Sequence, residues 1–342
     1  MVPGPGETVY GEYAEAVLEE IGSRRGDIAA ASSVNTLYIG GGTPSVLPLD
    51  ILSRIVTALP GRDWEEFTIE VNPEDIVEKG EEYVRGLMEL GVNRISMGIQ
   101  SFDDGILRWM NRRHYAARAE EAFRILRRCG VDNISLDLIF GLSQLDEAAW
   151  ADTIDRTLAL APEHISAYQL SVEEDSALEC MITKGRYVEA SEDQCRRQYD
   201  ILCERLGEAG YRHYEISNFS LPGREAVHNS AYWRRVPYVG LGPGAHSLSP
   251  LGVRSWNSCS VPDYSREEEV LTPEDIRIER IMLPLRTDSG LPEAELRSLA
   301  GDAAVDRLLS EGALVRQTNR PGWIRIPEDH FFTSDEIIRE LI

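Results

Sequence analysis

Two carboxylates in this chain interrupt otherwise apolar stretches, and they are the first candidates for chemistry. They are Glu70 and Asp137. A carboxylate in apolar surroundings costs several kcal/mol unless it is paired or bound to a ligand. One interpretation is therefore a general acid and a general base acting on a small metabolite. The other is a structural pair with an arginine, for which Arg94 or Arg112 would serve, and the residues alone leave both interpretations open.

A glycine-rich turn directly after a β-branched run could cradle an anionic ligand. It is Gly40-Gly41-Gly42-Thr43-Pro44. Residues without a Cβ atom let the backbone approach a ligand closely and leave N–H groups free for a carboxylate. The turn matches neither the P-loop nor the dinucleotide-binding pattern, because no Lys-Ser/Thr and no G-x-G-x-x-G follows. A tight turn without a ligand is the competing interpretation.

A histidine beside two aromatic residues is the candidate for an iron ligand. The segment is His228-Asn229-Ser230-Ala231-Tyr232-Trp233, and Arg234-Arg235 follows it. Imidazole binds iron, aromatic faces suit a flat macrocycle, and guanidinium groups suit the macrocycle's carboxylates. A single histidine is more often structural, so this segment by itself leaves heme binding as one of two interpretations.

The five cysteines do not form a metal site by their spacing. They are Cys129, Cys180, Cys195, Cys203 and Cys259. Two of them, Cys195 and Cys203, share a predicted helix, but eight residues correspond to about 12 Å of helix rise. An odd and sparse set of cysteines is typical of reduced thiols, so we expect a cytoplasmic protein without disulfide bonds.

The charge of the chain excludes one class of partner. There are 35 Lys plus Arg against 58 Asp plus Glu, and the net charge is −23. A phosphate backbone repels such a chain, so we expect no nucleic-acid binding. No apolar run approaches the ~20 residues that span a bilayer, and no signal-peptide pattern is present.

Five short apolar runs, each followed by a helical stretch, must position the candidate residues. The runs are Thr36 to Ile39, Phe67 to Val71, Arg94 to Ile99, Asn133 to Phe140 and His164 to Leu170. Strands that alternate with helices predict βαβ units around a parallel sheet. In barrels of this kind, functional residues gather at the C-terminal strand ends. We therefore expect the glycine-rich turn, Glu70, Gln100 and Asp137 to meet around one cavity.

The composition and the order of the expected elements divide the whole chain into four parts. The first part, residues 1–33, is expected to be a lead-in that is loose over 1–9 and forms a helix from Tyr10 to Ile21. The second part, 34–175, is expected to form a partial βα barrel core. The third, 176–262, would extend the barrel and contains the His228 segment, and the fourth, 263–342, would be a helical, winged-helix-like domain. The turn-rich composition from Val261 to Pro273 indicates a linker. The fold class is therefore α/β, and no strand precedes the run that starts at Thr36.

Taken together, these segments resemble the oxygen-independent coproporphyrinogen III oxidase-like branch of the radical S-adenosylmethionine (SAM) family, and within it the HemW-type heme chaperones. The resemblance rests on several segments in the same order along the chain. They are 38–45, Glu70-Val71-Asn72-Pro73, 94–102, Asn111-Arg112, 137–142, 228–233 and 240–247.

The resemblance implies a fold, ligands and partners. The fold would be a partial (β/α)6 TIM-like barrel of the radical SAM type with a C-terminal helical domain. The residues that would bind SAM are Gly41, Gly42, Thr43, Glu70, Gln100, Arg112 and Asp137, and His228 would bind heme. Heme-accepting proteins, membrane-associated heme proteins among them, would be the partners, and a homodimer is a further expectation.

The chain departs from the family at its iron–sulfur motif. The family places a C-x-x-x-C-x-x-C triad after the first barrel strand, and these thiolates hold a [4Fe–4S] cluster whose open iron binds SAM. Here no cysteine precedes Cys129, so we expect no cluster and no radical chemistry. Either the N-terminus is truncated or the chain is a natural degenerate relative.

Three functions are compatible with these residues and with the resemblance. The first is a heme chaperone that binds heme and SAM and delivers heme to acceptor proteins. The alternative is an oxygen-independent coproporphyrinogen III oxidase, which removes carboxyl groups from porphyrinogen propionates. A third is a barrel enzyme that uses Glu70 and Asp137 as acid and base and needs neither heme nor SAM. The His228 segment favours the first.

Overall fold

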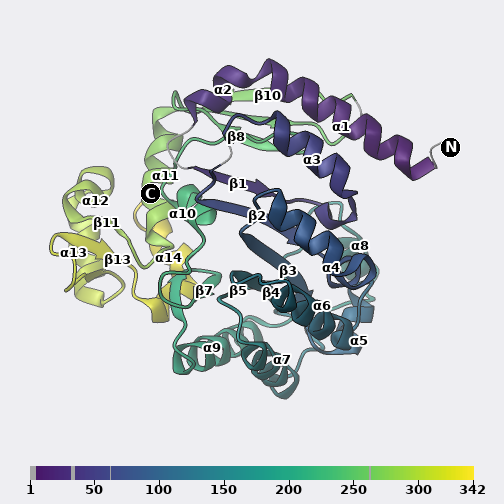
Figure 1. Cartoon of the computed structure of the whole chain (residues 1–342). Helices are drawn as coiled ribbons and strands as arrows, with labels where there is room; N and C mark the ends of the chain where they lie inside the picture. Colours follow the sequence, from purple (N-terminus) through teal and green to yellow (C-terminus); the bar gives the residue numbers. More distant parts are fainter. Residues whose placement is uncertain (1–4, 32–34, 62, 262) are drawn as a thin grey trace.

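A curled sheet forms the centre of the molecule, and helices cover its convex side (Figure 1). The computed structural model describes residues 5–31, 35–61, 63–261 and 263–342. The strand order is β1-β2-β3-β4-β5-β7-β6. The first five strands are parallel, and the hairpin of β7 and β6 continues the sheet antiparallel. This half-barrel confirms the predicted α/β class.

The five parallel strands lie where the apolar runs predicted them. They are β1 (Thr36–Ile39), β2 (Glu66–Val71), β3 (Arg94–Gln100), β4 (Ile134–Phe140) and β5 (His164–Gln169). The helices that connect them or follow them are α3 (Leu49–Ala58), α4 (Pro73–Glu89), α5 (Asp104–Trp109), α6 (Ala116–Arg128), α7 (Glu147–Leu160), α8 (Ala177–Thr183) and α9 (Glu192–Glu208). The hairpin strands are β6 (Arg212–Glu215) and β7 (Asn218–Ser220).

The two faces of the sheet differ in chemistry because successive side chains of a strand point to opposite sides. In β2, Phe67 and Ile69 are buried with apolar neighbours, whereas Glu66, Thr68 and Glu70 occupy the alternate positions. The same alternation recurs in β3 and β4. The helices therefore cover an apolar convex face, and the concave face is lined with polar groups.

Local sequence signals set the helix ends that matter here. The Asn72 side chain accepts a hydrogen bond from the Glu74 N–H, and Pro73 takes the first position of α4. Such a cap satisfies an N–H group that the helix itself cannot pair. Since Asn72 directly follows β2, the cap also fixes where that strand ends.

The N-terminal segment differs from the expectation of a loose lead-in. Helix α1 runs from Pro5 to Ser23 and α2 from Arg25 to Ala30. Proline is tolerated in the first turn because the N–H it lacks would have no partner there. The helix expected from Tyr10 to Ile21 is confirmed and extends in both directions; residues 1–4 and 32–34 lie outside the described residues. In the part of the chain that the structure covers, β1 is the edge strand.

The predicted linker is wrong, because a strand lies within it. Strand β10 (Arg266–Val270) pairs antiparallel with β9 (Val253–Asn257), which also pairs with β8 (His246–Leu248). The predicted boundary at 262/263 thus falls between two strands of one small sheet. All five residues of β10 are exposed, so pairing of its backbone, and not burial, accounts for the strand.

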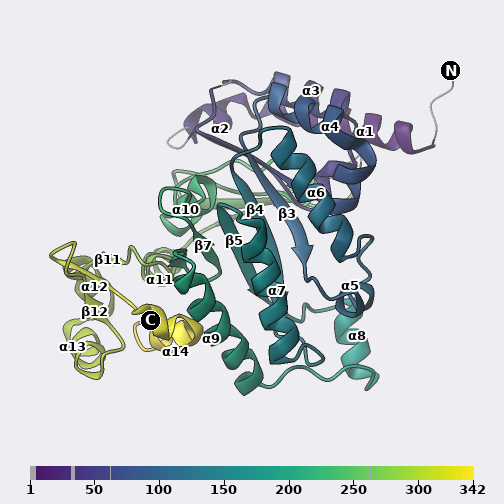
Figure 2. The ribbon, with the colours of Figure 1, turned by 60° about the horizontal axis from the view of Figure 1, so that its bottom comes forward.

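The C-terminal elements follow the predicted winged-helix-like order. They are α11 (Pro273–Leu285), β11 (Leu291–Pro292), α12 (Glu293–Ala300), α13 (Asp302–Glu311), β12 (Val315–Arg316), β13 (Trp323–Arg325) and α14 (Ser334–Arg339). Figure 2 shows α12, α13 and their small sheet at one side of the barrel. Short helix α10 (Val227–Trp233) lies on the concave side of the large sheet (Figure 1). Within the described ranges, no helix is both long enough and apolar enough to cross a membrane.

Candidate functional site

The polar concave face of the sheet encloses a cavity of about 350 Å³, which we call the barrel cavity. Six of the seven residues that the resemblance assigned to SAM line it. They are Gly42, Thr43, Glu70, Gln100, Arg112 and Asp137. Gly41 lies beside it, because its N–H donates a hydrogen bond to Glu70 Oε2 at 3.1 Å. The predicted convergence of strand ends on one cavity is confirmed.

Glu70 is held at the end of β2 by two donors. The Tyr38 hydroxyl donates to Oε1 at 2.8 Å, and the Gly41 N–H donates to Oε2. Burial raises the pKa of Glu70 above its ordinary value, the charge of Asp137 raises it further, and both hydrogen bonds oppose the shift. A cationic ligand in the cavity would favour the charged form of this carboxyl.

Asp137 lies deeper in the cavity. The Ser96 hydroxyl lies 3.0 and 2.9 Å from its two carboxylate oxygens, and the Ser135 hydroxyl donates to it at 3.3 Å. Burial raises the pKa of Asp137, which these hydroxyls and the charge of Arg94 only partly offset. In the part of the chain that the structure describes, neither Arg94 nor Arg112 forms an ion pair with Asp137 or Glu70. The structural-pair interpretation is therefore not what holds these carboxylates.

The side chains of Arg112 and Gln100 both lie close to Gly98, in the space that a side chain at that position would occupy. Arg112 Nη2 donates to the Gly98 carbonyl at 3.1 Å, and its buried Nε has no partner among the described groups. A Cβ on Gly98 would lie 2.6 Å from Gln100 Nε2 and 3.1 Å from Arg112 Nη2. Glycine is thus required for both side chains to occupy their positions, and a buried guanidinium N–H without a partner is a ready donor to a ligand's carboxylate.

His228 is fixed from three sides at the other end of the barrel interior. The Glu66 carboxylate accepts the N–H groups of Val227 and His228 at 2.7 and 3.1 Å, which places the start of α10 against β2. The imidazole stacks on Tyr38, with ring centroids 5.1 Å apart. Burial lowers the pKa of His228 below 6.5, and Glu66 only partly opposes the shift. The ring is therefore neutral near pH 7.

Both ring nitrogens of His228 have a hydroxyl partner. Nδ1 lies 2.7 Å from Thr36 Oγ1, and Nε2 lies 2.9 Å from the Tyr232 hydroxyl. If the threonine oxygen accepts from Nδ1–H, the lone pair of Nε2 accepts from Tyr232, and Nε2 is then the nitrogen available to a metal. Tyr232 is partly exposed and is the only group in the described structure that holds this nitrogen.

An apolar hollow of about 520 Å³, the His228 pocket, adjoins this histidine. Its walls come from α2, β1, the segment before β2, α10 and the segment after α10. They include Arg25, Ile28, Leu37, Leu59, Trp64, Ala231, Tyr232, Val236, Tyr238 and Leu241. The sequence places Arg234 and Arg235 shortly after His228, where their guanidinium groups would suit the carboxylates of a macrocycle. Neither lines this pocket, and Arg25 is the arginine that does.

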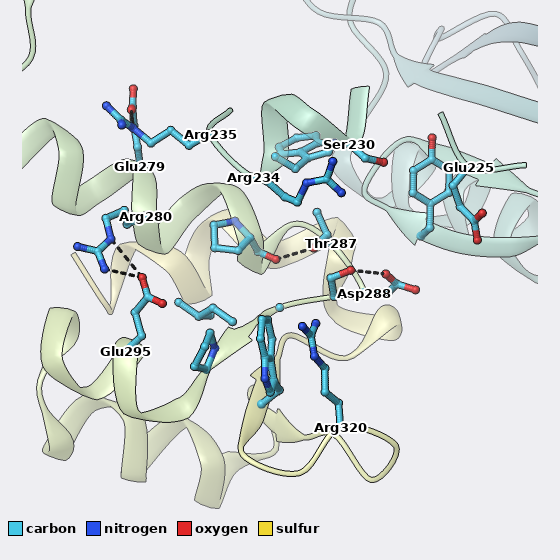
Figure 3. Close-up of a pocket in the computed structure, with 18 of the residues that line it drawn as sticks. Glu225, Ser230, Arg234, Arg235, Glu279, Arg280, Thr287, Asp288, Glu295 and Arg320 are labelled. Atoms are coloured by element: carbon cyan, nitrogen blue, oxygen red, sulfur yellow. Dashed lines mark hydrogen bonds and ion pairs between the residues drawn. The ribbon is translucent and has the colours of Figure 1, made fainter. Parts of the chain in front are cut away.

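Helix α10 presents its side chains to three separate hollows. His228, Ala231 and Tyr232 share one face because residues three and four positions apart are neighbours on a helix. Asn229 lines the barrel cavity. Ser230 and Trp233 line a third hollow of about 590 Å³, the Trp233 pocket (Figure 3).

The residues of this chain do not fit a [4Fe–4S] cluster. The five cysteines are unpaired and scattered, two of them exposed and Cys195 buried. Over the described ranges, no three His, Cys, Asp or Glu side chains lie close enough to share a metal ion. Three thiolates are what such a cluster requires.

Several residues of the site escaped the sequence reasoning. Tyr38, Ser96 and Asn229 line the barrel cavity, and Glu66 and Thr36 position His228. A signal was present, because polar residues occupy every second position of β2 and β3 where a sheet covered on both faces would be apolar throughout. That alternation marks a polar concave face.

Comparisons with known proteins fit this geometry. Residues 5–157 match the Radical SAM superfamily. The chain is 34% identical over 292 residues to the heme chaperone HemW of Lactococcus lactis subsp. lactis, which covers 82% of this chain and 74% of that protein. It is 32% identical over 309 residues to HemW of Synechocystis sp., an alignment that covers 84% of this chain and 72% of that protein. Among solved structures, coproporphyrinogen III oxidase (HemN) from Escherichia coli aligns with a TM-score of 0.76 and 19% identity over 97% of this chain and 83% of that one, which shows a shared fold.

Proposed function

This chain belongs to the HemW family of heme chaperones within the radical SAM superfamily, and we propose that it binds heme through His228 and passes it to acceptor proteins. The observation that carries the proposal is the state of His228. Burial lowers the pKa of His228, Thr36 contacts its Nδ1, and a single hydroxyl, that of Tyr232, holds its Nε2 beside an apolar pocket. A neutral imidazole held through one nitrogen can bind heme iron through the other once that hydroxyl moves away.

The pocket beside His228 supports a large, flat ligand. Its volume of about 520 Å³ lies within the range of cavities that bind small molecules and cofactors. Trp64, Tyr232 and Tyr238 offer ring faces, and Arg25 stands in the same wall without an ion pair in the described structure. A guanidinium at that position would pair with a carboxylate of the macrocycle.

SAM is the ligand proposed for the barrel cavity. The molecule carries a sulfonium and an amino group, both cationic, and one carboxylate. Glu70 and Asp137 suit the positive charges, since a nearby cation would restore the ionised form that burial disfavours. Arg112 suits the carboxylate. When bound, SAM would supply a positively charged sulfonium centre to this cavity; the chain's own residues bind and orient it.

The oxidase alternative requires a [4Fe–4S] cluster, and the described residues of this chain include no set of ligands for one. The proposed function therefore includes no radical step, and the oxidative decarboxylation of porphyrinogens is not proposed. The proposed role consists of binding and release of heme, with SAM as a second ligand in the barrel cavity.

A hemin titration tests the proposal. Purified protein mixed with hemin should develop the Soret band of a histidine adduct, and His228→Ala should weaken the affinity by about tenfold or more, since the iron loses its protein ligand. His246→Ala is the matched control, because His246 is exposed and lines none of the three hollows. Equal spectra and equal affinities for all three proteins would reject the role of His228.

A further inference from the structure

The Trp233 pocket is separate from both sites discussed so far. It is bounded by α10, α11, the 287–292 segment, α12 and the strand β13, so it lies where the barrel meets the C-terminal elements (Figure 3). None of the residues assigned to SAM or heme lines it. Helix α10 is the wall that it shares with the His228 pocket.

Three arginines of the pocket wall are already neutralised. Arg212 pairs with Glu225 at 3.0 Å and with Asp288. Arg235 pairs with Glu279 at 2.5 Å, and Arg280 pairs with Glu295 at 2.6 Å. These ion pairs fix the walls and account for all four carboxylates that line the pocket.

Two further arginines have no acidic partner in the described residues. They are Arg234, directly after α10, and Arg320, just before β13. Both are exposed, and Figure 3 shows them on opposite walls of the pocket. The lining holds five arginines against four carboxylates, so its net charge is +1 in a chain of net charge −23. Two guanidinium groups without a carboxylate attract an anion strongly within about 10 Å, the screening length at moderate ionic strength.

Two indoles accompany the unpaired arginines. Trp233 and Trp323 both line the pocket and are only partly buried. The Arg320 guanidinium lies over the Trp323 ring, 3.1 Å from its centroid. Stacked in this way, the guanidinium keeps its N–H groups in its own plane, where they can form two parallel bonds to a carboxylate or phosphate. The Trp233 indole adds flat apolar surface on which an unsaturated ring can stack.

We propose that the Trp233 pocket binds a small dianion that carries a planar unsaturated ring, with its ring against Trp233 and its carboxylate or phosphate oxygens on Arg234 and Arg320. The volume of about 590 Å³ fits a ligand of this size. The site includes neither His228 nor the residues assigned to SAM, so a test of this proposal does not depend on the proposed function.

Calorimetric titration of the full chain with two probes tests the proposal. Naphthalene-2,6-dicarboxylate presents the ring with carboxylates, and adenosine monophosphate presents a ring with a phosphate. At least one should bind and quench tryptophan fluorescence; the tighter one identifies the anionic group. Cyclohexane-1,4-dicarboxylate, which has the charge without the flat ring, should bind more weakly than the naphthalene probe.

Single substitutions then locate the site. Arg234→Ala and Arg320→Ala should each weaken binding by about tenfold or more, because each removes a charge-assisted bond to the anion. Arg339→Ala is the matched control, since Arg339 is exposed on α14, has no ion pair in the described structure and lines none of the three hollows. If Arg234→Ala and Arg320→Ala bind the probes as tightly as the unaltered chain does, the proposal is overturned. It is also overturned if neither probe gives any heat of binding at millimolar concentration. The hemin spectrum of both variants should match that of the unaltered chain.

Discussion

Removing the Tyr232 hydroxyl should strengthen hemin binding. In the free protein this hydroxyl lies 2.9 Å from His228 Nε2, the nitrogen proposed to bind iron. Iron can bind there only after the O–H···N bond has broken and the phenol has moved. Tyr232→Phe removes that competitor and keeps the ring, which packs edge-on against His228 with centroids 5.0 Å apart.

The size of the effect follows from the hydrogen bond that is lost. A hydrogen bond of this kind contributes about 0.5–1.5 kcal/mol net, and partial exposure of Tyr232 places it in the lower half of that range. Because each 1.4 kcal/mol is about tenfold in affinity, Tyr232→Phe should bind hemin about two to five times more tightly.

The assay is a hemin titration followed at the Soret band, with two further variants. Tyr238→Phe is the control, because Tyr238 lines the same pocket and packs against Tyr232 without a hydroxyl contact to His228. Thr36→Val should act in the opposite direction, since it removes the group that orients the imidazole through Nδ1. A Tyr232→Phe variant that binds hemin no better than the unaltered chain would refute the idea that the hydroxyl competes with iron.

Four further outcomes are expected at the site. Gly98→Ala should weaken SAM binding by about tenfold or more in equilibrium dialysis, since its Cβ displaces Gln100 and Arg112; Gly22→Ala, on open helix surface, should not. Burial raises the pKa of Asp137, so its charge destabilises the fold once the pH has risen through that pKa. Asp137→Asn should therefore raise the free energy of unfolding at pH 7 by on the order of 1 kcal/mol, measured by denaturant titration, and the gain should shrink as the pH falls toward 3.8. A proton competes with iron for Nε2, and burial lowers the pKa of His228. Hemin affinity measured from pH 8 downward should therefore reach half of its loss at a pH below 6.5, and a midpoint above 6.5 would contradict the direction of the shift. Anaerobic incubation with iron and sulfide should leave this chain without the absorbance of a [4Fe–4S] cluster, and a stoichiometric cluster would show that the cysteine argument is wrong.

The strands of the barrel were predictable because each buried strand is a short, largely apolar run in the sequence. The run from Thr36 to Ile39 coincides with β1, and the other four strands match their runs within one or two residues. By contrast, β10 has the sequence Arg-Glu-Glu-Glu-Val and no buried side chain. Pattern reasoning relies on apolar periodicity, which a fully exposed edge strand does not have.

The barrel cavity was predictable to the same extent and for a related reason. Parallel strands in one sheet end at one edge, so Glu70, Gln100 and Asp137 had to converge once the strands were assigned. The role of Glu66 could not be inferred, because it depends on α10 folding back against β2 from 161 residues further along the chain. Contacts of that range follow from the tertiary fold and leave no local signal.

The absence of Arg234 and Arg235 from the lining of the His228 pocket has a specific backbone cause. Seven residues after His228, a continued helix would return Arg235 to the same face. Helix α10 instead ends at Trp233, and Arg235 has a φ of +56°. The chain leaves the helix there, and Arg235 turns toward Glu279 on α11.

The position of the iron in a hemin complex tests the central claim most directly. Crystals of the protein grown with hemin and measured at the iron absorption edge should give one strong anomalous peak next to His228 Nε2, with the Tyr232 hydroxyl displaced from that nitrogen. An iron peak in the barrel cavity or in the Trp233 pocket, with the His228–Tyr232 hydrogen bond intact, would contradict the account.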